Sequence, residues 1–254
     1  MTPTASGKVL ALLDAFDADH PALTLSELAR RAGLPLSTTH RLAAELLGWG
    51  GLERGADQRY RIGLHLWEVG SMAPRGLGLR EAALPYMSDL YEATHENVQL
   101  AVREGIEVVF VERIAGRHAV PVLTRVGGRF PMSATGVGLV LLAFAPAEVQ
   151  EQALAAPMER FTPLTVTDAA RLRRVLADVR RTGLAVSDRQ VTLDALSVAA
   201  PVTGPGEEVI AALSVVVQYD GAVPQALAPA VRAAARGISR VLGAPLPPRQ
   251  AAPQ

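Results

Sequence analysis

The chain contains no cysteine among its 254 residues. Disulfides, thiolate nucleophiles and cysteine-based zinc sites are therefore all excluded. Lysine is almost as scarce, because Lys8 is the single lysine among the 25 lysines and arginines. Covalent chemistry through a lysine amine is thus excluded from the body of the chain.

Long hydrophobic runs are also missing. The longest, at 137–145 and 209–217, fall far short of the roughly 20 residues that a membrane helix needs. Asp14 and Asp17 interrupt the apolar N-terminal stretch, so no secretory signal is expected. We therefore expect a soluble, cytoplasmic protein with no membrane partner. Acidic and basic residues balance at 25 each, which argues against non-specific binding of polyanions but leaves room for a local basic surface.

The histidines give no sign of a metal site. None of them forms a recognisable ligand pair with a carboxylate, so we expect no metal and no cofactor. The triplet "HEN" at 95–97 comes nearest to an acid–base site, but it falls at a helix end before a strand, where capping is the simpler role. Phosphate-loop, dinucleotide-binding and nucleophile-elbow motifs are absent. The histidines are His20, His40, His65, His95 and His118.

The first third of the chain predicts three helices and a hairpin. After a helix at about 9–16, Thr24 and Glu27 stand in capping-box spacing and begin a second helix, which Gly33 ends. Pro35 begins a third helix, and "LERGADQRYRIG" at 52–63 is typical of a two-stranded hairpin. The apolar stripe of the third helix, which we expect to face inward, is Thr39, Leu42, Ala43, Leu46 and Leu47.

The remainder of the chain mixes strands and helices, which predicts an α+β fold built on an antiparallel sheet. The expected strands are 98–102, 106–114, 118–125, 184–187, 195–202 and 209–217, and the expected helices are 80–95, 136–145, 146–155, 167–181 and 224–242. We place a first domain at 1–63, a linker at 64–80, a second domain at 81–243 and a disordered tail at 244–254.

Two helices joined by a glycine turn and followed by a hairpin form a winged helix-turn-helix, whose second helix enters the DNA major groove. "STTHR" at 37–41 opens that helix with small hydroxyl side chains, which suit close approach to phosphates and base edges. Arg41 has the reach for a guanine edge, and Arg59 and Arg61 would share one face of the wing. The alternative is that the hydroxyls only cap the helix, in one of the many helix-turn-helix units that bind no DNA.

The sequence resembles the IclR-type bacterial transcriptional regulators over roughly residues 6–245. The resemblance is carried by "LTLSELARRAGLPLSTTHRLAAEL", "VQLAVREGIEVVFVERI", "GGRFPMSATGVGLVLLA" and "ALSVAAPVTGPGEEVIAALSV". It implies a repressor or activator that binds a pseudo-palindromic operator in double-stranded DNA as a homodimer or a dimer of dimers (homotetramer). It also implies a GAF-like C-terminal domain with a small-molecule effector pocket. The residues expected at the DNA are Ser26, Ser37, Thr38, His40, Arg41, Arg59, Tyr60 and Arg61.

The family's pocket maps by position onto one face of the C-terminal sheet and the loops after it. "SATGVG" supports this independently, because it gathers hydroxyls and backbone amides at a helix start, where a carboxylate binds well. The alternative is that Gly136 and Gly138 merely permit close packing of helix and sheet. The expected pocket residues are Val122, Phe130, Met132, Ser133, Thr135, Gly136, Val137, Asp188 (or its neighbour Ser187), Ser197, Ser214 and Val216.

The chain departs from the family pattern in three places. Leu139 stands where a lysine is usual, "DRQVTLDAL" lacks the usual glutamate and glycine, and Val216 replaces a serine. With fewer polar groups, the pocket is expected to take an aromatic or medium-chain carboxylic acid, or its ester or lactone, from a catabolic pathway. The other function considered is a hydrolase or transferase that carries an accessory helix-turn-helix domain.

Overall fold

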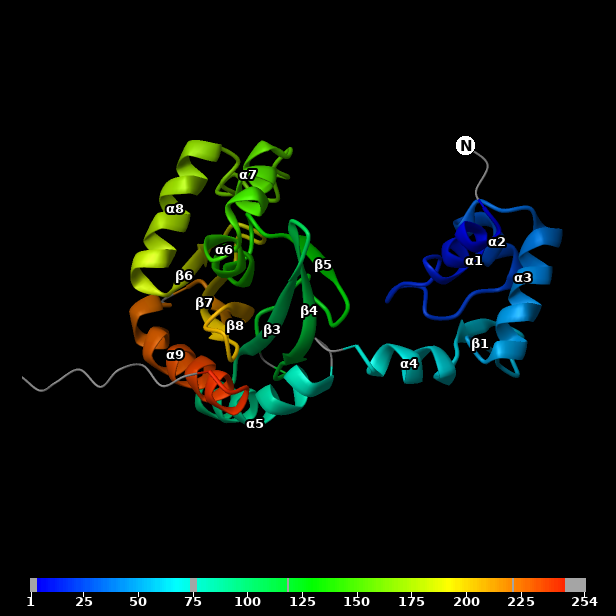
Figure 1. The fold of residues 1–254 in the computed structure, drawn as a ribbon, viewed down its shortest axis with the longest axis horizontal. Coiled ribbons are helices and arrows are strands. Elements are labelled where there is room, and N and C mark those ends of the chain that lie inside the picture. The colour runs from blue at the N-terminus through cyan, green and yellow to red at the C-terminus, as the bar shows by residue number, and fades with distance from the viewer. Residues whose placement is uncertain (1–3, 74–76, 118, 221, 245–254) are drawn as a thin grey trace, which may run out of the picture. The chain divides into compact units, whose positions relative to one another are not determined.

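The computed structural model describes residues 4–73, 77–117, 119–220 and 222–244. The chain folds into two compact units, with the division between Leu77 and Gly78 (Figure 1). This division falls inside the segment predicted as a linker. The predicted tail lies, except for Ala244, outside the described residues. Among the described helices, none has the length and apolar character needed to cross a membrane.

The first unit contains helices α1 (Ala5–Leu13), α2 (Leu25–Ala32), α3 (Leu36–Trp49) and α4 (Leu64–Ser71), with a hairpin of β1 (Leu52–Arg54) and β2 (Tyr60–Ile62). The capping box that starts α2 is confirmed: Thr24 Oγ1 accepts the Glu27 amide, and Glu27 accepts the Thr24 amide at 2.8 Å. Gly33 ends α2 in the left-handed conformation, with φ of 66°. The predicted winged helix-turn-helix is therefore present.

The inward stripe predicted for α3 packs into the core of this unit. Leu42, Ala43 and Leu46 are buried there, and Leu47 is half-buried against them. Thr39 is buried too, and its hydroxyl donates to the Pro35 carbonyl at 3.1 Å, which satisfies the polar group inside the helix. The other buried members of this core are Leu12, Ala15, Leu23, Leu28, Leu52 and Tyr60.

The second unit is built on a six-stranded antiparallel sheet in the order β5-β4-β3-β8-β7-β6. Its strands are β3 (Asn97–Glu104), β4 (Glu107–Ile114), β5 (Arg129–Pro131), β6 (Ala185–Asp188), β7 (Ala195–Thr203) and β8 (Val209–Gln218).

The strand predicted at 118–125 is wrong: the described part of that segment, 119–125, forms a loop. This loop is held by hydrogen bonds from side chains of neighbouring strands and not by a ladder of backbone hydrogen bonds. Asn97 of β3 donates to the Val120 carbonyl at 2.8 Å, and Gln99 donates to Thr124 Oγ1 at 2.5 Å. Pro121 also lacks the amide that a ladder needs. Beside β4, the edge of the sheet is formed by β5, in a segment where no strand was predicted.

Helices cover both faces of this sheet (Figure 1). One face packs against α5 (Leu77–Thr94) and α9 (Pro224–Val241), and the other against α6 (Gly136–Ala143), α7 (Ala147–Ala155) and α8 (Ala169–Thr182). Because strand side chains alternate, Leu213 and Val215 of β8 belong to the first core, whereas Ala212 belongs to the second. Ser214 and Val216 share the face of Ala212 and reach the cavity described below.

Candidate DNA-reading helix and effector pocket

The exposed side of α3 carries the polar residues predicted to meet DNA. Ser37, His40 and Arg41 are exposed and Thr38 is half-exposed, while Ser26 is exposed on α2. Helix α3 begins after Pro35, and no side chain of the described residues caps it. Its first turn therefore presents backbone amides and small hydroxyls together, which is the arrangement that binds phosphate oxygens.

Each of the three predicted arginines makes an ion pair. Arg41 contacts Glu45, one turn along α3, at 2.5 Å, with both side chains more than half exposed. Arg59 donates to Glu27 at 3.0 Å and to the Ala22 carbonyl at 3.1 Å, so it links the hairpin to the start of α2.

Arg61 forms a two-pronged ion pair with Asp57, at 2.9 and 2.6 Å. This contact raises the pKa of the Arg61 guanidinium and holds the pKa of the Asp57 carboxyl well below its usual range. Because Asp57 lies in the turn of the hairpin, the pair braces the wing and places the Arg61 guanidinium next to its tip.

Tyr60 was predicted to meet DNA, and the structure corrects this. Its side chain is only 3% exposed and belongs to the core of the first unit, where its backbone pairs with Leu23. The alternation of a strand explains the error, because the residue between two outward arginines faces inward. A buried ring cannot touch a DNA groove.

The second unit contains a cavity between its sheet, the start of α6 and two loops. The centre of a water molecule can occupy about 50 Å³ of it, and its empty space reaches about 460 Å³ when the open mouth is included. Seven predicted residues line it: Val122, Thr135, Gly136, Val137, Ser197, Ser214 and Val216.

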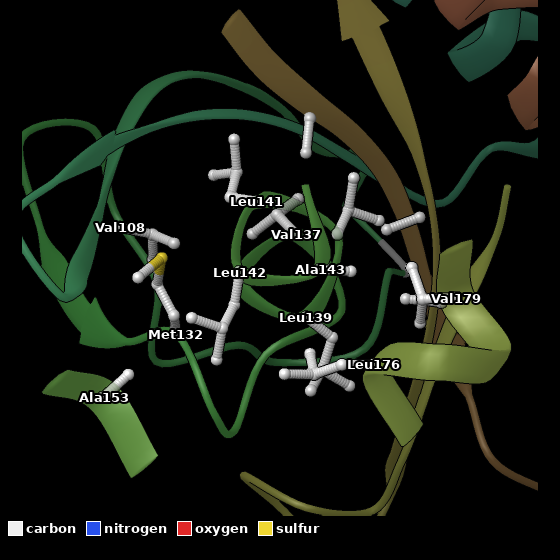
Figure 2. Packing of buried hydrophobic residues seen from close by; sticks show 14 of the residues in the cluster. Val108, Met132, Val137, Leu139, Leu141, Leu142, Ala143, Ala153, Leu176 and Val179 are labelled. Atoms are coloured by element: carbon white, nitrogen blue, oxygen red, sulfur yellow. The ribbon is translucent and has the colours of Figure 1, made fainter. Parts of the chain in front are cut away.

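Four predicted pocket residues lie elsewhere. Met132 is buried in the core beside Val108 (Figure 2), and the Phe130 ring packs 5.6 Å from that of Phe161. Ser133 is buried but does not line the cavity. Asp188 is exposed and pairs with Arg189. Side chains of β6 face opposite ways in turn, so Ser187 faces the cavity instead of Asp188.

Leu139 also lies outside the cavity. It is buried in the core between sheet and helices, beside Leu176 of α8 (Figure 2). The replacement of the family's usual lysine therefore changes the packing of α6 and not the polarity of the cavity wall. The other two departures do line the cavity: Val216 directly, and "DRQVTLDAL" through Gln190, Val191, Thr192 and Ala195.

Sequence reasoning missed several lining residues. Gln99 is the most informative of them. A polar residue within the apolar strand "VQLAV" needs a polar partner when buried, so the sequence itself indicated a polar site here. Gln190 joins the cavity through a loop whose position no local pattern reveals: its carbonyl accepts from Thr165 Oγ1, and its side chain accepts the Val166 amide. Ser187, the alternative given for Asp188, does line the cavity, and the missed residues are Gln99, Leu123, Thr124, Gln190, Val191, Thr192 and Ala195.

The cavity wall is polar in places but carries no charged side chain among the residues that line it. Thr135 caps α6 by accepting the Gly138 amide at 3.0 Å, so this amide is already paired. A Cβ on Gly136 would lie 2.6 Å from Ser197 Oγ, and one on Gly138 would lie 2.4 Å from the Met132 carbonyl oxygen. Both glycines thus permit close packing, and Gly136 forms part of the cavity wall as well.

The described residues contain no group of three or more histidine, aspartate and glutamate side chains placed to hold a metal ion. Four of the five histidines lie within the described ranges, and His118 lies outside them. His20 contacts Asp17 at 2.9 Å and His65 contacts Glu68 at 2.8 Å, both at exposed helix ends or turns.

Comparison with known proteins covers nearly the whole chain. The family described as "Bacterial transcriptional regulator IclR C-terminal" matches residues 73–240, and the "IclR helix-turn-helix domain" matches residues 7–56. The HTH-type transcriptional regulator KipR of Bacillus subtilis (strain 168) is 31% identical over 209 residues, which are 82% of this chain and 83% of that protein. The transcriptional repressor IclR of Escherichia coli (strain K12) is 29% identical over 228 residues, 84% of this chain and 82% of the repressor.

Among solved structures, an IclR homologue from Microbacterium hydrocarbonoxydans, crystallised in complex with 4-hydroxybenzoate, is similar to this chain. It is 43% identical with a TM-score of 0.87, and the match covers 92% of this chain and 97% of the homologue.

Proposed function

Because the chain belongs to the IclR family of bacterial transcriptional regulators, we propose that α3 reads an operator and that the cavity of the second unit binds the effector that controls it. Membership of this family means that the chain is a DNA-binding transcriptional regulator under small-molecule control. The observation that carries the assignment of α3 is its exposed, uncapped first turn, with Ser37, Thr38 and Arg41 on one side and the core on the other. Ser26 and His40 flank this surface, and Arg59 and Arg61 support the wing beside it.

The effector that suits the cavity best is an aromatic carboxylic acid. Val122, Val137 and Val216 supply apolar walls, which gain about 25 cal/mol for each Å² of apolar ligand surface that they remove from water. Hydroxyl and amide side chains supply the orienting contacts, and the start of α6 supplies a partial positive charge. The homologue crystallised with 4-hydroxybenzoate supports the same class.

We further propose a homodimer, or a dimer of dimers, on a two-fold symmetric operator in the cytoplasm. One recognition helix for each chain fits a palindromic site only if two chains bind together. Exposed apolar side chains in the first unit support association: Leu10 of α1, Leu64 and Trp67 of α4, and Met72 directly after α4 are each more than half exposed.

The proposed domains are 1–63 for DNA, 64–80 for the linker and 81–243 for the effector. A sensor without enzymatic activity is proposed, since the relatives are named as regulators and the cavity wall carries neither an acid nor a histidine.

A panel of acids tests the effector assignment. Purified protein is heated with acids that range from glyoxylate and pyruvate to benzoate, 4-hydroxybenzoate and longer aliphatic acids. The aromatic acids are expected to raise the melting temperature most and to be recovered unchanged. Stabilisation by the two- and three-carbon acids alone would contradict the assignment, and conversion of a bound acid to product would restore the enzyme alternative.

A further inference from the structure

Arg113 of β4 is a half-buried cation that forms no ion pair with a carboxylate of the described residues. Its guanidinium donates to neutral oxygens instead: Nε and Nη2 contact Asn97 Oδ1 at 3.2 and 2.8 Å, and Nη1 contacts the Thr124 carbonyl at 3.4 Å. The adjacent Glu112 pairs with Arg80. Burial lowers the pKa of the Arg113 guanidinium, so a charge without an anion at this place in the fold calls for an explanation.

The register of the sheet places this guanidinium beside the floor of the cavity. Arg113 lies opposite Gln99 of β3, which lines the cavity. Asn97, which accepts from the guanidinium, lies opposite Val216 of β8, another lining residue. Residues directly opposite in an antiparallel pair share a face of the sheet, and neighbouring strands lie about 4.8 Å apart. The Arg113 side chain therefore reaches the strand next to Val216, on the face that carries the cavity.

The start of α6 lies at the other end of the same row. Ser197 of β7 lies opposite Val216 and against Gly136. Two strand spacings, about 10 Å in all, thus separate Asn97 from Ser197, with the apolar Val216 between them. The two ends differ in charge, because a guanidinium carries a full positive charge and a helix start about half of one. A carboxylate therefore gains more at the end where Arg113 lies.

The loop at 119–125 separates the guanidinium from the cavity. Thr124 of this loop lines the cavity, its carbonyl accepts from Arg113, and its hydroxyl accepts from Gln99 at 2.5 Å. The cavity must widen to admit a ring, because the centre of a water molecule can occupy about 50 Å³ of it and one water needs on the order of 10–15 Å³. The α6 wall belongs to the buried core, whereas side chains of neighbouring strands hold the loop. The loop is therefore the wall that can move.

We infer that Arg113 is the charged partner of the effector's carboxylate and that the effector displaces Thr124 to reach it. The inference rests on the proposed function, which makes this cavity the effector site. The carboxylate replaces the Thr124 carbonyl as the acceptor of Nη1, so that a half-buried charge gains an anion. The ring lies over Val216, and a polar group at its far end reaches the start of α6. A ligand of the same shape without the negative charge leaves Arg113 without an anion and binds more weakly.

Titration calorimetry of the full-length protein with 4-hydroxybenzoate and with 4-hydroxybenzamide tests the inference, because the amide has the shape of the acid without its charge. Wild-type protein is expected to bind the acid at least tenfold more tightly than the amide. Arg113→Gln is expected to bind the amide like wild type and to lose this preference. Arg129→Gln is the matched control: it removes an exposed arginine of the neighbouring β5, which pairs with Glu107, and should keep the preference.

Arg113→Lys separates a charge that binds the ligand from a side chain that only supports the loop. Lysine keeps the positive charge but cannot reproduce the paired contacts with Asn97 Oδ1. Without ligand, both Arg113→Gln and Arg113→Lys are expected to melt below wild type, but Arg113→Lys should still bind the acid at least threefold more tightly than the amide.

Equal loss of the preference in the two Arg113 variants would show a supporting role only and would overturn the inference. An unchanged preference in Arg113→Gln would overturn it as well. So would wild-type protein that binds the acid and the amide equally well, or that binds neither.

The release of operator DNA distinguishes this inference from the proposed function. If the preference for the acid depends on Arg113 while DNA affinity ignores the acid, effector control fails and the assignment of Arg113 stands. If DNA affinity responds to the acid while Arg113→Gln keeps the preference, the assignment of Arg113 fails and effector control stands.

Discussion

Arg41 and Glu45 lie one turn apart on the exposed side of α3 and form an ion pair. An exposed pair of this kind adds little to stability, so either side chain is free to take another partner. Arg41→Ala is expected to weaken operator binding by about 1–3 kcal/mol if the side chain reads a base. Fluorescence anisotropy with labelled duplex measures this.

Two controls accompany that prediction. Glu45→Gln releases Arg41 without removing it and should bind at least as tightly as wild type. Arg173→Ala, on exposed α8 of the second unit, should leave the affinity unchanged. Wild-type affinity in Arg41→Ala would show that this face of α3 turns away from the groove.

The contacts of Asp17 predict that the free energy of unfolding of the first unit falls at acidic pH. A hydrogen bond from His20, with further contributions from the His20 amide and Arg31, lowers the pKa of its carboxyl from 3.8 to about 2. Since the folded state favours the ionised form, the stabilisation is present above about pH 4 and is lost as the pH falls through about 2. Both tryptophans, Trp49 and Trp67, lie in the first unit, so their emission follows its unfolding.

The comparison to make is between wild type and Asp17→Asn in urea unfolding at several pH values. The variant should be less stable at neutral pH, and the difference should shrink toward zero near pH 2. A difference that stays constant with pH would show that the Asp17 carboxylate gains nothing from its neighbours in the folded state.

At single residues, the sequence predicts burial well and contact partners poorly. Helical spacing was enough to divide α3 into an inward and an outward face. Neighbouring side chains of a strand face opposite ways, so Tyr60 could not share the outward face of Arg59 and Arg61, and of the alternatives Asp188 and Ser187 the latter faces the cavity. Gln190 was missed because its place depends on contacts with the distant segment 165–166.

Among the elements, the start of α3 makes the sharpest prediction. It has no acidic residue in its first turn and no side-chain cap. Ser37→Asp places a negative charge at the positive end of the helix and should stabilise the first unit by about 0.3–1 kcal/mol. The same charge should weaken DNA binding, because it faces the phosphates. Tryptophan-detected melting and anisotropy measure the two effects, which have opposite signs.

Ser37→Ala serves as the companion variant, since it removes the hydroxyl without adding charge. Its DNA affinity should fall less than that of Ser37→Asp. Tight DNA binding by Ser37→Asp would exclude the start of α3 from the interface.

The contact of α6 with β7 sets the width of the cavity at Gly136. An added Cβ would lie 2.6 Å from Ser197 Oγ and 3.2 Å from Ser197 Cβ, so the Ser197 hydroxyl must rotate away or helix and strand must shift apart. Gly136→Ala should therefore lower stability by about 1–3 kcal/mol, as overpacking does, and weaken effector binding.

The double variant Gly136→Ala with Ser197→Ala tests the cause, because it removes the oxygen in the closest contact. It should recover part of the lost stability in thermal melting. Equal stabilities of the single and double variants would place the strain somewhere other than this contact.

The helices and strands that carry strong local signals were all predicted. The error was a strand predicted in a segment that forms a loop. Capping residues, glycine stops and apolar periodicity located α2, α3, α8 and α9. The loop at 119–125 has the composition of a strand, but its backbone carbonyls accept from the side chains of Asn97 and Arg113, and its Thr124 hydroxyl accepts from Gln99. Such contacts join residues far apart in sequence, and no local pattern reveals them.

On the scale of the whole molecule, the function requires that two separately folded units communicate. The effector alters DNA affinity only if it binds one arrangement of the DNA-binding units more tightly than another. A fragment of the first unit alone should therefore bind half-sites weakly and ignore the effector.

Selection of duplexes from a random library by the full-length protein, with and without 4-hydroxybenzoate, tests the central claim most directly. Sequencing of the bound pool should reveal one enriched motif with two-fold symmetry, and the acid should change the amount of that motif recovered. Arg41→Ala should lose the enrichment. Two results would contradict the claim that this protein reads DNA sequence under effector control. One is a wild-type pool as random as that of Arg41→Ala, and the other is a motif whose recovery responds to no aromatic acid in the panel.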